Sequence, residues 1–171
     1  MRSLQTHESE NTSAESLNYF LAAIAIRRLL NRAHHLLYGK EQGTPFNQSL
    51  PSTIRELDSQ LNSWRETLPQ NLRFEVNGSP RSYATSPNMW EGGNERQGYL
   101  RQRYLACQTM IWRPCMIWAF NPEAQASIGS SQNSEMMRGY RRSFDSCLLY
   151  AHELRSFTYT VFINSWAVSF S

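Results

Sequence analysis

The chain has 171 residues, a length that fits one domain and is sufficient to bury a hydrophobic core. Its net charge of +3 is carried almost entirely by arginine, because Lys40 is the only lysine, and the basic residues are spread along the chain. This weak, dispersed charge gives little support to a nucleic-acid-binding protein, and the hydrophobic fraction of 40% excludes a chain that is disordered throughout.

Residues 1–11 are polar and lack an apolar run, so they are predicted to be a disordered N-terminus and not a signal peptide. Thr12 and Glu15 then match a capping box, in which a hydroxyl and a carboxylate satisfy free amides at a helix start. The segment that follows is predicted to be a helix of about six turns with one apolar stripe. The stripe consists of Tyr19, Ala23, Ile26, Leu30, Ala33 and Leu37. Gly39 and Gly43 indicate where this helix ends.

A second helix is predicted after Pro51, where Thr53 and Glu56 form another capping box. Its apolar stripe consists of Ile54, Leu57, Leu61, Trp64 and Leu68. Pro69 ends the helix, because proline disfavours a helical conformation in the residue before it. The glycines and prolines of residues 70–96 predict a long loop.

A third helix is predicted from about Glu95 to Phe120, with a stripe of Leu100, Tyr104, Cys107 and Ile111. Pro114 lies inside this pattern and is expected to kink the helix, since it removes a backbone donor near Met110. Residues 121–134 begin with Asn-Pro and continue as a stretch rich in Ser, Gln and Gly, which predicts a second loop.

A fourth helix is predicted from a stripe that comprises Tyr140, Phe144, Cys147 with Leu148, Ala151 and Leu154. The last segment, Phe157 to Phe170, is apolar on all sides, which favours a core helix and leaves a strand as the alternative. Five helical segments without a convincing sheet predict an all-α fold, an irregular bundle of about five helices with long polar loops.

No catalytic, cofactor-binding or metal-binding residue is predicted, because the chain lacks a glycine-rich phosphate loop and a nucleophile turn. His34 and His35 are adjacent and do not converge on one metal ion. Cys107, Cys115 and Cys147 are interpreted as buried inert thiols, since they lie on predicted helices, and an odd, sparse set of cysteines fits a reducing compartment. No Cys-x-x-Cys pair exists, so these thiols alone cannot form a zinc finger or zinc cluster. The many aromatic residues are assigned mainly to the core, and an aromatic-lined cavity for an apolar small molecule stays open as an alternative.

Four groups of residues occur in a distinctive order along the chain. They are Leu36-Leu37-Tyr38; Leu61, Trp64, Leu68-Pro69 and Leu72; Leu100 through Tyr104 to Arg113-Pro114; and Cys147 with Ala151 before the aromatic stretch to Trp166. This order resembles the middle homology region of fungal zinc-cluster transcription factors, and the resemblance spans about Leu17 to Trp166. It implies that residues 12–171 are the C-terminal part of this helical regulatory region, as a fragment, a truncated gene model or a decayed paralogue.

The resemblance further implies transcription regulation in the nucleus, without enzyme activity and without membrane contact. The expected partners are a transcriptional co-regulator, a small effector or a zinc-cluster regulator. With a zinc-cluster regulator the chain is expected to form a dimer, either a homodimer or a heterodimer. DNA would be contacted only indirectly, because the family's six-cysteine zinc cluster is absent and no cofactor is expected in this chain. Arg113 and Pro114 carry over as structural residues, with Arg113 expected to cap carbonyls or pair with a carboxylate.

The alternatives are a helical interaction module that never binds DNA, or a small-molecule-binding helical domain, each derived from such a factor. An enzyme on a helical scaffold is a further, less favoured reading.

Overall fold

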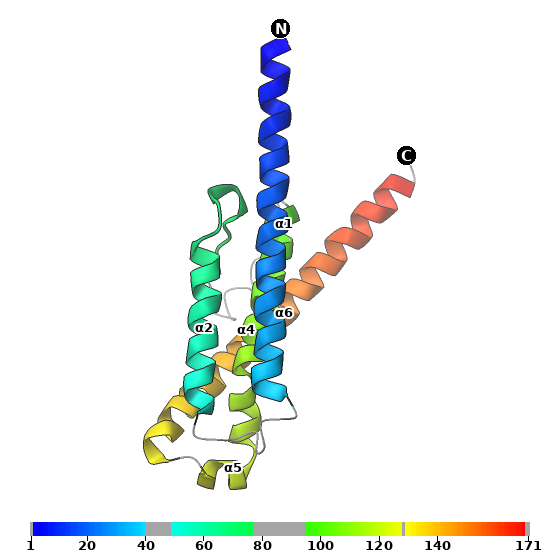
Figure 1. Cartoon of the computed structure of the whole chain (residues 1–171). Coiled ribbons are helices and arrows are strands. Elements are labelled where there is room, and N and C mark those ends of the chain that lie inside the picture. Colours follow the sequence, from blue (N-terminus) through cyan, green and yellow to red (C-terminus); the bar gives the residue numbers. More distant parts are fainter. Residues whose placement is uncertain (1, 40–48, 77–94, 128, 170–171) are drawn as a thin grey trace.

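The computed structural model describes the backbone of residues 2–39, 49–76, 95–127 and 129–169, and the side chains of residues 13–39, 49–76, 95–126, 129 and 132–154. In these residues the fold is all-α, as predicted, and no strand is formed. The elements are α1 (Arg2–Tyr38), α2 (Leu50–Glu66), the 3-10 turn η1 (Gln70–Leu72), α4 (Glu95–Ala119), α5 (Pro122–Ser127) and α6 (Ser130–Ser169) (Figure 1).

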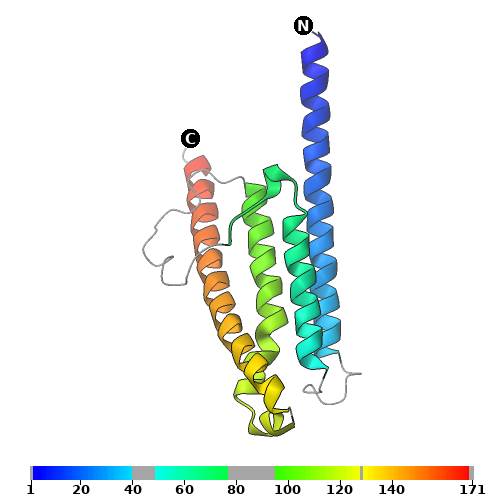
Figure 2. The same ribbon diagram turned by 90° about the vertical axis from the view of Figure 1, so that its left-hand side faces the viewer.

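Helix α4 is the centre of the arrangement, since it packs against α1, α2 and α6. Figure 2 shows α6 on one side of α4, and α2 followed by α1 on the other, so that α1 and α6 lie at opposite edges. The short helix α5 lies at the end of the bundle, and the N-terminal part of α1 extends past the opposite end. Both edge helices therefore keep one long side away from the other helices.

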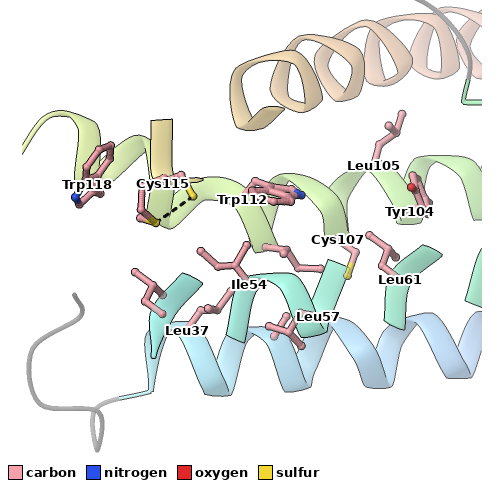
Figure 3. Close-up of a cluster of buried hydrophobic side chains, with 14 of the residues drawn as sticks. Leu37, Ile54, Leu57, Leu61, Tyr104, Leu105, Cys107, Trp112, Cys115 and Trp118 are labelled. Carbon is pink, nitrogen blue, oxygen red and sulfur yellow. Dashed lines mark hydrogen bonds between the residues drawn. The ribbon is translucent and has the colours of Figure 1, made fainter. Parts of the chain in front are cut away.

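The core forms where the predicted stripes of the first three long helices meet around α4 (Figure 3). These stripes are confirmed: the buried members are Ile26, Ala33, Leu37, Ile54, Leu57, Leu61, Leu68, Leu100, Tyr104, Cys107 and Ile111. Trp64 is only partly buried, and it packs against both clusters of the core. Its indole Nε1 donates a hydrogen bond of 3.2 Å to the carbonyl of Ala22, so it fastens α2 to α1.

Pro114 lies inside α4, and the helix continues through it to Ala119. Because proline has no amide hydrogen, the carbonyl of Met110 loses its usual partner four residues later. The hydroxyl of Tyr38 donates a hydrogen bond of 2.9 Å to this carbonyl. Tyr38 is the last residue of α1, so the carbonyl freed by Pro114 becomes a fixed contact between α1 and α4.

Helix α1 ends at Tyr38, as predicted, and glycine suits the next position because a Cβ atom at Gly39 would collide with the carbonyl oxygen of His35. Its predicted start was wrong. The backbone is helical from Arg2, so residues 2–11 are not a disordered N-terminus, and Thr12 and Glu15 lie inside the helix. No glycine or proline interrupts residues 2–38, and the polar residues of this stretch are compatible with a helix.

Two other boundaries differ from the prediction for local reasons. Helix α2 begins at Leu50, so Thr53 lies inside it, where its hydroxyl donates back to the carbonyl of Ser49 at 3.0 Å instead of capping a free amide. Within the predicted loop of residues 121–134, α5 forms because the Asn121 side chain accepts hydrogen bonds from the amides of Glu123 and Ala124.

Helix α6 starts at Ser130 and runs to Ser169 as one helix, so the separate fourth and fifth helices predicted here are wrong. After Gly139 no glycine or proline occurs that would break it. The strand alternative for the last segment is excluded as far as Ser169, while the side chains of its predicted stripe lie outside the described residues. In the other predicted loop, residues 70–76 form η1 and an irregular segment, residues 95–96 begin α4, and residues 77–94 lie outside the described part.

Candidate functional site

The side of α6 that packs against α4 is made mainly of small and polar residues. Gly139, Ser143, Ser146 and Glu153 are all buried there, together with Met136. A Cβ atom at Gly139 would lie 2.5 Å from the Cys115 sulfur and 2.9 Å from the ring of Trp112, so only glycine fits without a shift. Near the start of α6, the Cys115 and Met136 sulfurs are 3.9 Å apart (Figure 3). The two helices therefore approach closely at Gly139, while the large apolar side chains of Met136 and of the partly buried Tyr140, Leu149 and Tyr150 also pack against the core.

The predicted inward stripe of α6 is wrong, because most of it faces solvent. Phe144, Leu148 and Leu154 are 49%, 44% and 38% exposed, and Ala151 is also exposed. Tyr140 and Cys147 are partly buried. The small residues permit the close approach to α4, so they occupy the interface and turn the apolar side chains outward. Apolar residues recurring every three or four positions do form one face of this helix, but it is the outer one.

An apolar surface, called here the α6 patch, runs from the end of α4 along the outside of α6. It consists of Ile117, Phe120, Met137, Tyr140, Phe144 and Leu148. Phe120 is 75% exposed, and its ring meets the Tyr140 ring edge to face at a centroid distance of 6.1 Å. Met137, Phe144 and Leu148 are spaced by seven and four residues, so they lie along one side of the helix. Exposed apolar side chains gathered on one side of a helix in this way are typical of an interaction site.

Polar contacts fix the position of the α6 patch relative to the core. The buried Asp58 carboxylate on α2 accepts a hydrogen bond of 3.0 Å from Trp112 Nε1 on α4. The same carboxylate pairs with the Arg142 guanidinium of α6 at 3.1 Å, and this guanidinium lies 4.9 Å from the centre of the Trp112 ring. Asn62 donates to Asp58 at 3.3 Å and accepts from the Tyr104 hydroxyl at 2.9 Å. This network joins α2, α4 and α6, so the outer face of α6 is presented on a rigid support.

A second ion pair lies further along the α4–α6 interface. Arg101 Nη2 and Glu153 Oε1 are 2.7 Å apart, and both side chains are largely buried. Burial raises the pKa of the Glu153 carboxyl above its ordinary value, and the Arg101 and His152 charges oppose this rise only in part. Helix α6 is thus held by close packing and the Arg101–Glu153 pair with α4, and by the Arg142–Asp58 pair with α2.

The outer side of α1 carries a second exposed apolar cluster. Leu17, Phe20 and Leu21 are 56%, 59% and 54% exposed. They are followed along the helix by the exposed residues Arg27, Arg28 and Arg32. Arg32 donates a hydrogen bond to the side-chain oxygen of Gln60, which is a neutral partner. Apolar and basic side chains therefore succeed one another on the outside of this edge helix.

The cysteines and histidines that could carry reactive chemistry differ in burial. Cys107 and Cys115 are buried, and burial raises the pKa of each thiol to about 12, so these two thiols stay protonated at neutral pH. Cys147 is partly exposed. His34 and His35 are both exposed, and the His34 ring packs against the Tyr38 ring at 5.7 Å. No group of three potential metal ligands occurs in the part of the chain that the structure describes.

The expected role of Arg113 is not found in the described residues, where no carboxylate pairs with it and its side chain is exposed. Its charge acts on Tyr38 instead, where it opposes the effect of burial, and burial still raises the Tyr38 pKa to about 12. Sequence reasoning also missed the outward direction of the α6 stripe. The spacing of Gly139, Ser143 and Ser146 by four and three residues is a signal that could have revealed the close helix contact.

Comparisons of this chain with protein-family models, with curated proteins and with solved structures found no match. Among the described residues, no helix combines the length and the apolar character that crossing a membrane requires. The observations that bear on function are therefore the two exposed faces and the way in which the sequence motifs pack together.

Proposed function

We propose that this chain is a non-catalytic helical regulatory domain that acts in transcription regulation. In this proposal it corresponds to the C-terminal part of the middle homology region of fungal zinc-cluster transcription factors. It works in the nucleus and binds a protein partner through the α6 patch, the partner being a zinc-cluster regulator or a co-regulator. The chain carries no DNA-binding domain of its own, so it reaches DNA only through such a partner or through an attached domain.

Contacts between the motif groups support the resemblance on which this proposal depends. Tyr38 of the first group donates to the Met110 carbonyl that Pro114 of the third group leaves free. Trp64 of the second group stacks on Tyr104 of the third, with ring centres 6.5 Å apart. Residues that are far apart in the sequence therefore depend on one another, which is a physical reason for these motifs to occur together.

The observation that carries the proposed mode of action is the outward apolar stripe of α6. A helix of a free-standing domain usually turns its apolar side to the core. Here the inner side combines small and polar residues with Met136 and is fixed by Asp58, Glu153 and close packing, so the outer side is available for another protein. The half-exposed Phe144 and Leu148 side chains would become buried in that complex, and burying apolar area is the main driving force of such contacts.

The proposal can be tested with the complete chain fused to an unrelated DNA-binding domain in yeast cells. The fusion is expected to change the output of a reporter gene at least about threefold relative to the DNA-binding domain alone. The double substitution Phe144→Ser and Leu148→Ser is expected to abolish the change. Because both side chains are half exposed, it should alter the free energy of unfolding by less than about 1 kcal/mol.

The matched control is Arg141→Ser with Asp145→Ser, two exposed polar positions on the same helix. This variant should keep the reporter effect. A fusion without any effect on the reporter would overturn the role in transcription. An effect that survives the loss of Phe144 and Leu148 would overturn the assignment of the α6 patch as the site of action.

A further inference from the structure

The outer side of α1 carries basic residues as well as apolar ones. The two kinds together restrict the chemistry of a partner more than the apolar residues alone would. Leu17, Phe20, Leu21 and the half-buried Ile24 occupy about two turns, and Arg27, Arg28 and Arg32 occupy the next two. These seven residues are called here the α1 face. With a rise of 1.5 Å per residue, the face is about 22 Å long, which equals a partner helix of about 16 residues.

Within the described part of the protein, no carboxylate forms a direct ion pair with the arginines of the α1 face. From Ser16 to Gly39 the helix contains no acidic residue. The ion pairs among the described residues involve Arg55, Arg101 and Arg142, and none involves an arginine of the α1 face. The apolar half would favour an apolar ligand, and the basic half would repel any ligand that is itself basic.

The order of the two halves distinguishes a protein helix from a membrane surface. A helix that lies on an anionic membrane has apolar residues along the whole of one side and basic residues along the other. On α1 the apolar and basic residues succeed one another along the same exposed side. Immersing Phe20 and Leu21 in lipid would therefore also press the arginines toward it. A helix with an apolar half and an acidic half satisfies both halves at once.

We infer that the α1 face binds an amphipathic helix whose N-terminal turns are acidic and whose C-terminal turns are apolar, antiparallel to α1. The inference rests on the proposed function in treating the chain as an interaction domain, and it adds a second surface and the chemical class of its partner. Antiparallel binding places the acidic turns against Arg27, Arg28 and Arg32. Acidic residues in the first turns also stabilise the partner helix itself, because they interact favourably with its macrodipole.

A direct test measures the binding of fluorescent synthetic peptides to the purified full-length chain by anisotropy. The first peptide has about 16 residues, with glutamates on one side of its first two turns and leucines on the same side of its last two. The second has the same residues in the reverse order, and the third has lysine in place of each glutamate. The first peptide is expected to bind about tenfold more tightly than the second, and the third should not bind measurably.

Variants of the α1 face measure the contributions of its basic and apolar halves to binding separately. Arg27→Glu with Arg28→Glu should weaken the first peptide at least about tenfold, and raised salt should weaken its binding to the wild type. Phe20→Ser with Leu21→Ser should also weaken it at least about tenfold, with little change in the salt dependence. Arg138→Glu is the matched charge control, since Arg138 is exposed on α6 at the opposite edge of the bundle (Figure 2). It should leave binding unchanged.

Three results would overturn the inference. One is equal binding of the acidic peptide by the wild type and by the Arg27→Glu, Arg28→Glu variant. Another is equal binding of the peptide and its reversed form, which would remove the antiparallel arrangement. The third is tight binding to vesicles of anionic phospholipid that requires Phe20 and Arg28, together with weak peptide binding, which would assign the face to membranes. The assay involves neither the reporter gene nor the α6 patch, so its failure is distinguishable from failure of the proposed function.

Discussion

Helices α2 and α6 both pack against α4, and they do so with different chemistry. α2 presents Ile54, Leu57 and Leu61, each almost completely buried, to the aliphatic and aromatic side chains of α4. α6 presents Gly139, Ser143, Ser146 and the carboxylate of Glu153, together with Met136 and the partly buried Leu149 and Tyr150. The α2 contact is therefore an ordinary hydrophobic core, while the α6 contact depends in addition on close approach and on charge pairs.

The difference shows how a helix can be anchored and still keep an apolar surface for another protein. If α6 were anchored through Phe144 and Leu148, its outer side would be polar and unsuited to a large apolar interface. Anchoring through small and polar groups leaves these side chains exposed on a rigid helix. Substitutions on the two sides of α4 should therefore change the free energy of unfolding by different amounts and with different pH dependence.

The largest effect is expected on the α2 side, from Trp64→Ala. Trp64 packs against both core clusters and donates to the Ala22 carbonyl. Its loss should lower the free energy of unfolding by about 3 kcal/mol, the lower end for tryptophan truncation because the residue is partly exposed. Urea denaturation followed by circular dichroism measures this loss. Trp64→Phe keeps an aromatic ring and loses the hydrogen bond, so about 1 kcal/mol is expected.

A loss smaller than about 1 kcal/mol for Trp64→Ala would mean that α2 does not depend on this aromatic contact.

The buried sides of three helices could be predicted from the sequence. The stripes of α1, α2 and α4 were predictable because Ile26, Leu57 and Ile111 pack against equally apolar neighbours. In such a core the hydrophobic period of each helix is enough to decide which side is buried.

The orientation of α6 and the candidate interaction faces could not be read from the same pattern. Periodicity shows that Phe144 and Leu148 share a side, but it does not show whether that side meets α4 or solvent. The choice depends on the fit of Gly139 against Cys115 and Trp112 and on the pairing of Glu153 with Arg101, which bring together residues far apart in the sequence. The start of α1 was missed because Thr12 and Glu15 suit a helix interior as well as a helix start.

An intermediate effect is expected from Gly139→Ala on the α6 side. In an exposed helix, alanine in place of glycine stabilises by about 1 kcal/mol. Here the new methyl group would overlap the Cys115 sulfur and the Trp112 ring, and crowding of this kind costs about 1–3 kcal/mol. The net result should be a destabilisation of about 1 kcal/mol in urea denaturation.

Gly129→Ala is the matched control, because a Cβ atom at Gly129 would meet no atom within 4 Å. It should change the free energy of unfolding by less than about 1 kcal/mol. If Gly139→Ala instead stabilised the protein, the close contact between α4 and α6 would be wrong. The inward direction of Ser143 and the outward direction of Phe144 would then be in doubt as well.

The smallest effect is expected from Glu153→Gln, and it should appear in the pH dependence. Burial raises the pKa of the folded-state carboxyl, so the stability that this group contributes is fully present below its unfolded pKa and is lost as the pH rises through its folded pKa. The wild type should therefore lose stability relative to Glu153→Gln as the pH rises from 4.5, the ordinary value for this carboxyl, into the neutral range. Urea denaturation of both proteins across that range measures the difference in the free energy of unfolding.

Arg101→Met removes the cation that opposes the rise in the Glu153 pKa, so it should enlarge this pH dependence. A difference that stayed constant with pH would mean that the pKa of Glu153 is the same in the folded and the unfolded chain. The polar anchoring of α6 would then rest on its ion pairs with α2, which are Arg142–Asp58 and Arg55–Glu135.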